Sequence, residues 1–187
     1  MFADARSKKM VLVAHCILNQ NSISDGTAGF PATFKDVIAL LLEYDVGVVQ
    51  LPCPELACLG LDRGDVHGAE RPVIIENSRI RESLSQTGPT EKLKAIVDQV
   101  IYQIEEYRKH DFFLLGIIGI NRSPSCGVET TSMNNEEVPG MGLFMEAVRR
   151  ELSAREIHID MIGVKTSEIE RSFLKTKGLL DGRFEKN

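Results

Sequence analysis

Hydrophobic residues along this chain gather in short continuous runs that alternate with longer stretches of helical periodicity. The runs are rich in β-branched residues and bounded by turn-forming residues, which is typical of strands buried on both faces. Four such runs predict strands, at residues 10–16, 46–51, 112–120 and 157–162. Strands that alternate with helices in this way predict an α/β fold with an open, mainly parallel, Rossmann-like sheet and helices on both of its faces.

Apolar residues at helical spacing predict the helices between these strands. The longest helix is expected from Thr90 to about residue 110. Thr33, with Asp36 three positions further on, is expected to cap an earlier helix, and Thr166 is expected to cap the last one. Residues 56–72 are glycine-rich and charged without a clear period, so we expect a long functional loop there.

The composition indicates a globular protein that forms one domain over residues 1–187, with hydrophobic residues at 43% and charged residues at 26%. The net charge is −5, and no basic cluster is long enough for a phosphate-binding stripe, so DNA is not an expected partner. The first ten residues lack an apolar signal region, and no apolar run is long enough to span a bilayer. We therefore expect a cytoplasmic protein, with monomer and homodimer both open.

Three of the four cysteines lie at or after the ends of predicted strands. Cys16 closes the first strand, Cys53 lies two residues past the second, and Cys126 lies six past the third. Right-handed crossovers bring the carboxyl ends of parallel strands to one edge of the sheet, where ligands bind. We therefore expect these three thiols at one edge. Cys58 lies in the apolar stretch 56–60, which favours packing in the core.

Soft thiolates at one edge of a sheet select zinc, copper(I) or an iron–sulfur cluster. Structural zinc takes four ligands, commonly in paired C-x2-C spacings, and such spacings are absent here. A four-iron cluster held by three cysteines leaves one iron open to a sulfur or oxygen atom of a substrate. The alternative is that the cysteines are small buried hydrophobic residues.

Several side chains near these cysteines are candidates for acid–base chemistry. Glu55, two residues after the second cysteine, is the best-placed carboxylate, although a solvated loop glutamate remains the alternative. Ser123 and Ser125 are candidates to bind a substrate or relay a proton, or they only form the turn. His15 is expected in the core or in a supporting role, and His67, in the predicted long loop, remains a candidate.

Short motifs follow one another along the chain in a definite order. They are Cys16-Ile-Leu with Asp25-Gly26 after it, Cys53-Pro54-Glu55, Ser123-Pro-Ser-Cys-Gly127 and Gly140-Met-Gly142. Over about residues 10–164 these motifs resemble the 2-thiouracil desulfurase family, and within it a desulfurase-related branch of desulfidases. The Ser-Pro-Ser-Cys-Gly motif is specific to this family, and the shorter motifs support the resemblance through their order and spacing.

The resemblance implies a cofactor and roles for individual residues. It implies a [4Fe-4S] cluster bound by three cysteines, with one open iron that takes the sulfur of a thiolated substrate; these cluster ligands are Cys16, Cys53 and Cys126. Glu55 would be the catalytic carboxylate, and Ser123 the serine that assists it. The loops that carry the motifs supply four further candidates for contact with the substrate, which are Asn19, Asp25, Ser125 and Gly127.

The chain departs from the family at three places around the expected site. Asn19 stands where the family usually has glycine, Ser24 precedes Asp-Gly where the family tends to have tyrosine, and residues 59–63 replace a Gly-Leu-Pro-Thr-Pro-Arg segment. These changes leave the expected cluster ligands intact and alter the loops around the substrate.

Taken with the motifs, the residues predict an oxygen-sensitive iron–sulfur desulfidase. Its expected substrate is a small thiocarbonyl heterocycle resembling thiouracil, whose carbon–sulfur bond is hydrolysed with release of sulfide. One alternative is another enzyme with an open-iron cluster, such as a dehydratase or its electron-delivering component. The other is a non-enzymatic α/β module that binds a small molecule.

Overall fold

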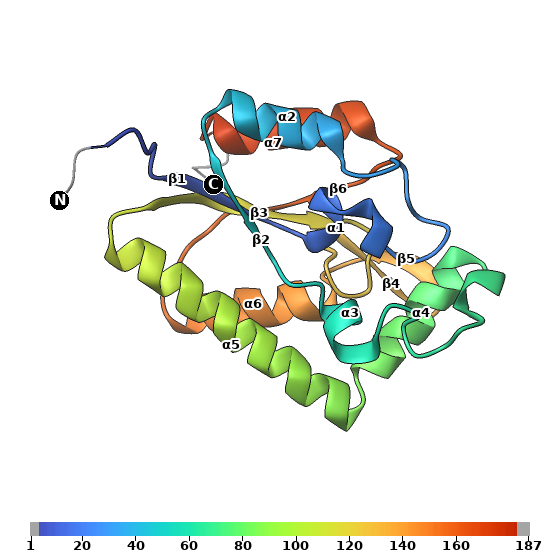
Figure 1. Ribbon diagram of the computed structural model, residues 1–187. Helices are drawn as coiled ribbons and strands as arrows, with labels where there is room; N and C mark the ends of the chain where they lie inside the picture. The colour runs from blue at the N-terminus through green and yellow to red at the C-terminus, as the bar shows by residue number, and fades with distance from the viewer. Residues whose placement is uncertain (1–3, 183–187) are drawn as a thin grey trace.

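A four-stranded parallel sheet forms the centre of the protein (Figure 1). The computed structural model describes residues 4–182. The strand order is β2-β1-β3-β6, and each neighbouring pair is parallel. The strands are β1 (Lys9–Val13), β2 (Gly47–Gln50), β3 (Phe113–Ile120) and β6 (Met161–Val164). The predicted α/β class with a mainly parallel sheet is therefore confirmed.

Helices cover both faces of this sheet (Figure 1). The helices α2 (Lys35–Glu43) and α7 (Ile169–Leu180) pack against each other on one face, and α5 (Thr87–Lys109) and α6 (Leu143–Ala154) do so on the other. Their apolar sides meet the strands in one core, because continuous strand runs must be covered on both faces. None of the helices described between residues 4 and 182 is long and apolar enough to cross a membrane.

Shorter elements gather beyond the carboxyl ends of the strands, on the right of Figure 1. They include a two-stranded antiparallel hairpin, which is separate from the main sheet. These elements are α1 (His15–Leu18), α3 (Pro54–Leu59), α4 (Val73–Leu84), the 3-10 turns Gln20–Ser22 and Gly68–Glu70, and the hairpin strands β4 (Thr130–Met133) and β5 (Glu136–Pro139).

The fourth strand of the sheet starts later than the apolar pattern predicts. Residues 157–162 were the expected strand, but β6 begins at Met161, where its pairing with Ile117 of β3 starts. The preceding residues approach β3 through a single hydrogen bond, from the Ile117 amide to the Asp160 carbonyl at 2.8 Å. The strand β6 ends at Val164, so the next residue, Lys165, lies at the carboxyl edge of the sheet.

Neither of the two predicted threonine caps forms. The helix α2 starts at Lys35 without a side-chain cap, and the Thr33 hydroxyl donates instead to the Ile17 carbonyl at 2.8 Å. The helix α7 starts at Ile169, also without a side-chain cap. Thr166 instead lines a pocket at the carboxyl edge of the sheet. Tertiary contacts of the loops therefore outweigh the local capping signal at both threonines.

Residues 56–72 do not form one long irregular loop. Residues 56–59 continue α3, and residues 68–70 form a 3-10 turn. The sequence also gave no clear signal for α4 or for the hairpin at residues 130–139, because polar and charged side chains interrupt the apolar period in both. The longest helix begins at Thr87 and not at Thr90.

Candidate functional site

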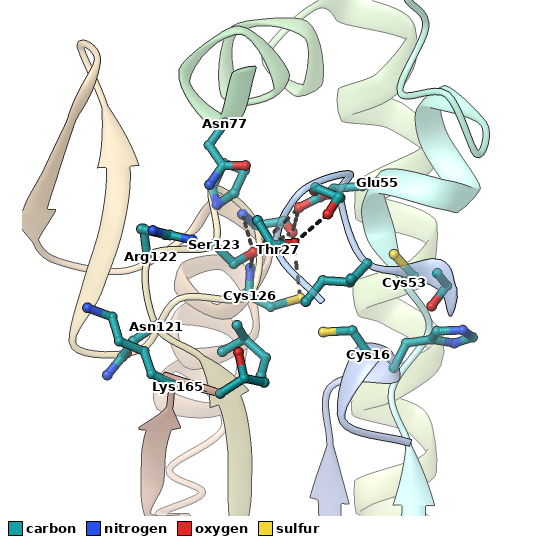
Figure 2. A pocket seen from close by; sticks show the side chains of 18 of the residues that line it. Cys16, Thr27, Cys53, Glu55, Asn77, Asn121, Arg122, Ser123, Cys126 and Lys165 are labelled. Atoms are coloured by element: carbon teal, nitrogen blue, oxygen red, sulfur yellow. Dashed lines mark hydrogen bonds between the residues drawn. The ribbon is translucent and has the colours of Figure 1, made fainter. Parts of the chain in front are cut away.

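A pocket of about 90 Å³ lies at the carboxyl edge of the sheet. Its wall includes three cysteines and the carboxylate of Glu55, which reach it from segments far apart in the sequence (Figure 2). Cys16 follows β1, Cys53 follows β2, and Cys126 follows β3. The three cysteines that come after strand ends therefore share one pocket.

Cys16 enters the pocket from a helix and not from the end of a strand. The strand β1 ends at Val13, and the chain turns directly into the short helix α1, which contains Cys16. The side-chain amide of Gln20 donates to the Cys16 carbonyl at 2.6 Å and holds this turn. Burial raises the pKa of the Cys16 thiol, and Cys53 and Glu55 add to the effect because their negative charges oppose a third one.

Cys53 is the N-cap of α3. Its sulfur accepts a hydrogen bond from the Leu56 amide at 3.4 Å, so it takes the place that a serine or aspartate oxygen often fills. Pro54 occupies the first turn, where the missing amide proton has no intrahelical partner to lose. Burial raises the pKa of the Cys53 thiol to about 11, with a further contribution from the charge of Glu55.

Cys126 lies in a loop whose backbone is organised by Ser123. The Ser123 hydroxyl oxygen accepts hydrogen bonds from the amides of Ser125 at 3.3 Å and of Cys126 at 2.9 Å. The Ser125 hydroxyl oxygen lies 3.6 Å from the Cys126 sulfur. Burial raises the pKa of the Cys126 thiol, followed by repulsion from Cys16 and Cys53. Each thiol therefore opposes ionisation of the others, as neighbours in one pocket do.

The donor chemistry of this pocket fits a soft, positively charged group. Thiols that keep their protons because of burial and mutual repulsion release them when a metal takes their charge. Among the side chains of residues 4–182, no group of three or more His, Cys, Asp or Glu residues is close enough together to hold a single metal ion. The ligands of an iron–sulfur cluster need not converge on one point, since each of them binds a separate iron atom.

Glu55 lies almost fully buried at the centre of a dense hydrogen-bond network. Its Oε1 accepts from the hydroxyls of Ser125 at 2.6 Å and Ser123 at 3.4 Å. Its Oε2 accepts from the Ser24 hydroxyl at 3.2 Å and from the Arg63 guanidinium at 3.1 Å. The carboxylate is therefore fixed in position, and it points towards Ser123 in the pocket (Figure 2).

Arg63 is the side chain that compensates the charge of Glu55. The side chains of this ion pair are 4% and 5% exposed, and a buried carboxylate without such a partner is strongly disfavoured. The guanidinium also donates to the carbonyls of Leu61 at 2.6 Å and Ser22 at 2.5 Å. Its own backbone has a positive φ of 56°, so the loop is bent to aim the side chain inward.

The structure separates the four candidate substrate contacts. Ser125 lines the pocket, whereas Asn19, Asp25 and Gly127 do not. Asn19 caps the 3-10 turn by accepting from the Asn21 amide at 3.1 Å, and Asp25 is exposed. Gly127 is buried behind the pocket, where an added Cβ would lie 2.2 Å from the Thr130 carbonyl oxygen. Its role is therefore close packing of the loop.

The remaining sequence candidates lie in three different environments. His15 lines the pocket, and burial followed by the charge of Arg63 lowers the pKa of its imidazole. His67 lies outside the pocket wall on an exposed turn, where it pairs with Glu70 at 2.8 Å. Cys58 is 7% exposed within the hydrophobic core and is also absent from the pocket wall. The core position of Cys58 agrees with the packing expected from its apolar neighbours.

Several polar residues of the pocket wall were not among the sequence candidates, and they include Arg63, Asn77, Arg122 and Lys165. Arg63 lies in residues 56–72, where a loop was expected without a role for this arginine. Asn77 belongs to α4, a helix that was not predicted. Arg122, with a positive φ of 70°, directly precedes the serines of the most specific motif, and this neighbourhood was the one available clue.

Comparisons with known proteins span most of the chain. No protein-family model matches it. An uncharacterized protein of Methanocaldococcus jannaschii is 28% identical over 172 residues, which cover 91% of this chain and 96% of that protein. Among solved structures, the [4Fe-4S]-dependent thiouracil desulfidase TudS is similar at a TM-score of 0.49 and 16% identity, covering 90% of this chain and 98% of its own.

Proposed function

We propose that this protein is an iron–sulfur-dependent desulfidase that removes sulfur from a small thiocarbonyl compound. The observation that carries the proposal is the shared pocket: the three cysteines that follow strand ends line it together with a buried, hydrogen-bonded Glu55. The motif resemblance to the 2-thiouracil desulfurase family supports the same assignment of these residues.

Cys16, Cys53 and Cys126 are the residues that would hold a [4Fe-4S] cluster. When bound by three cysteines, such a cluster supplies one iron without a protein ligand, which is thiophilic and Lewis acidic. The pocket wall places Glu55 and both serine hydroxyls in the same space as the three sulfurs. A substrate sulfur and the proton-transfer groups would therefore meet in one enclosed site.

The proposed reaction is a hydrolysis that needs no net electron transfer. The thiocarbonyl carbon exchanges its double bond to sulfur for one to oxygen; water supplies the oxygen, and the sulfur leaves as sulfide together with the protons of that water. Glu55 accepts a proton from the attacking water, which makes the water oxygen more nucleophilic. Its position supports this role, since the ion pair with Arg63 at 3.1 Å holds the carboxylate in place.

Ser123 is the group best placed to move this proton onward. Its hydroxyl lies within 3.4 Å of Glu55 Oε1 and 3.2 Å of the Ser125 hydroxyl, and either serine oxygen can be the donor. Hydroxyl protons rotate freely, so the pair can pass a proton between Glu55 and the departing sulfur. The longer contact of Ser123 is also the weaker one, and it is more easily released to a substrate.

The first experiment tests the ligands by anaerobic reconstitution with iron and sulfide, followed by an iron and sulfide count and an absorption spectrum. Cys16→Ala, Cys53→Ala and Cys126→Ala should each lose the cluster. Cys58→Ala is the matched control, because it removes a thiol from α3 outside the pocket wall, and it should retain the cluster. Loss of the cluster in all four variants, or in none, would contradict the ligand assignment.

The second experiment tests the chemistry on reconstituted protein with a panel of thiolated bases, nucleosides and thioamides. Sulfide and the oxygenated product should form together, whereas sulfide alone indicates cluster decay. Glu55→Gln should lower turnover by roughly 10²–10⁴-fold with the cluster retained. An intact cluster that yields no product from any compound would refute the desulfidase assignment.

A further inference from the structure

Asn77 presents an unsatisfied hydrogen-bond acceptor at the pocket. This α4 residue is 3% exposed and lines the pocket wall. Its side-chain nitrogen donates to the Ser132 hydroxyl at 3.3 Å. Its side-chain oxygen Oδ1 is buried and has no hydrogen-bond partner among the described residues. Figure 2 shows the side chain reaching from α4 into the group of side chains that line the pocket.

The hydrogen bonds of Ser132 determine which end of the Asn77 amide faces it. The Ser132 hydroxyl donates its one proton to the Arg122 carbonyl at 2.6 Å. It therefore contacts Asn77 only as an acceptor, which requires the amide nitrogen on that side. The oxygen Oδ1 then faces away from Ser132, which does not line the pocket.

A buried amide oxygen without a donor is unusual in a folded protein. Buried acceptors nearly always have a partner, because an unmade hydrogen bond leaves the desolvation penalty uncompensated. Another buried side-chain acceptor of the wall differs from Asn77, because the Glu55 carboxylate already accepts hydrogen bonds from three hydroxyls and a guanidinium. A donor group on a molecule bound in the pocket would supply the partner that Asn77 Oδ1 lacks.

We propose that Asn77 is a substrate-binding residue that accepts a hydrogen bond from an N–H group of the ligand. This inference rests on the proposed function and narrows its substrate class to thiocarbonyl compounds with an N–H donor, such as secondary thioamides and cyclic thioureas. Tertiary analogues, in which a methyl group replaces that hydrogen, leave Oδ1 without a partner and bring carbon against it. Asn77 thus favours thiocarbonyl compounds that have an N–H donor over methylated analogues with the same carbon–sulfur bond.

The test compares 2-thiouracil with its 1-methyl and 3-methyl analogues, together with uracil and the matching methyluracils. Binding to reconstituted protein is measured anaerobically by calorimetry, and sulfide is measured in the same samples. For the unaltered protein, one of the two methyl positions should weaken binding by about tenfold or more, as expected for the loss of one well-made buried hydrogen bond. Equal affinities for all three thiouracils would overturn the role of Asn77.

Two variants separate hydrogen bonding from steric exclusion. Asn77→Ala removes the acceptor and makes room for a methyl group, so the preference should fall to within about twofold through weaker binding of 2-thiouracil. Ser78→Ala is the matched control: Ser78 is also 3% exposed on α4, but its hydroxyl bonds to Ile74 and Asn135 outside the pocket wall. It should keep the full preference. A preference that persists in Asn77→Ala would overturn the proposal, because the preference would then not depend on Oδ1.

The outcomes for Asn77 and for the desulfidase function are distinguishable. A methyl preference among the uracils or thiouracils without sulfide release would uphold the role of Asn77 and contradict the desulfidase function. Sulfide and product formed equally well from every thiouracil would uphold the function and overturn the role of Asn77. Binding of none of the six compounds would overturn the role of Asn77 as well.

Discussion

The two loops that meet over the pocket differ in how tightly they are packed. The serine loop, residues 121–127, is buried at Asn121 and throughout residues 124–127. The cover loop, residues 19–32, exposes residues 25–26, 28–29 and 31–32, although a few of its side chains face inward. Both loops contribute to the pocket wall, but none of residues 121–127 is exposed, whereas several residues of the cover loop are.

Close backbone contacts fix the serine loop from both sides. An added Cβ at Gly142 would lie 2.5 Å from the Ser125 carbonyl oxygen, and one at Gly119 would lie 2.3 Å from that of Cys126. Asn121 Oδ1, at the start of the loop, accepts from the amides of residues 128, 129 and 130, which follow its end, at 3.4, 3.0 and 3.4 Å. The position of Cys126 is therefore set by backbone packing that no flexible side chain can relieve.

The cover loop is held by a few side-chain contacts. Gln20 is 2% exposed, and it donates to the Cys16 carbonyl and accepts from the Gly29 amide at 3.0 Å. Arg63 attaches the loop to the pocket through the Ser22 carbonyl. Cys126 and its neighbouring serines therefore lie on the tightly packed loop. Asn19 and Ser24, where the chain departs from the motifs that it resembles, lie on the less constrained loop.

Arg63→Met should give the largest effect, because it leaves the buried Glu55 carboxylate without its cation and releases Ser22. Breaking a buried ion pair from one side costs about 3–5 kcal/mol of unfolding free energy. Amide hydrogen exchange should rise in the cover loop and change little in the serine loop. The double variant Arg63→Met with Glu55→Gln should recover much of the stability; no recovery would mean that the ion pair is not the cause.

Gly127→Ala should destabilise the serine loop by about 3 kcal/mol, because the new Cβ would lie 2.2 Å from the Thr130 carbonyl oxygen and 2.8 Å from that of Ser123. Gly127 directly follows Cys126, so cluster binding should weaken as well. Gly26→Ala is the matched change in the cover loop, and its positive φ of 74° predicts a loss of only about 1–2 kcal/mol. Denaturant unfolding measures both, and equal losses would remove the difference between the loops.

Asn121→Ala should cost about 2–3 kcal/mol, since the backbone amides of residues 128–130, directly after the serine loop, lose their acceptor while staying partly buried. Asn19→Ala in the cover loop removes only the cap of a 3-10 turn and should cost about 0.5–1 kcal/mol. Thermal unfolding of the two variants compares the loops with the same substitution. A larger loss for Asn19→Ala would reverse the assignment of rigid and tolerant loops.

The fold class and the shared position of Cys16, Cys53 and Cys126 could be predicted from the sequence. The reason is that the carboxyl ends of parallel strands lie at one edge of a sheet, independently of the loop conformations. The conformations of the loops could not be predicted from the sequence. Thr33 looked like a cap because its local signal is real, but a contact with Ile17 takes its hydroxyl instead. Arg63 and Asn77 reach the pocket only through tertiary packing, and no local period or spacing reports such packing.

The smallest expected effect concerns the pH dependence of the anchor behind the serine loop. Burial opposes ionisation of Glu129, but hydrogen bonds from Lys175 and Asn121 outweigh it and lower the pKa of this carboxyl below its usual value. Because the folded pKa is the lower one, the stabilisation is present above the unfolded pKa of about 4.3 and is lost as the pH falls through the folded value.

Glu129→Gln should therefore remove a small part of the acid sensitivity of unfolding. The carboxylate is 41% exposed, so solvent screening limits its contribution to about 0.5 kcal/mol at neutral pH. Urea unfolding between pH 3 and 7 measures the difference, with Glu91→Gln, on an exposed side of α5, as the matched control variant. A Glu129→Gln protein with the parent's acid profile would show that Asn121 holds the serine loop without help from this charge, since the Asn121 carboxamide also donates to the Gly163 carbonyl at 3.3 Å.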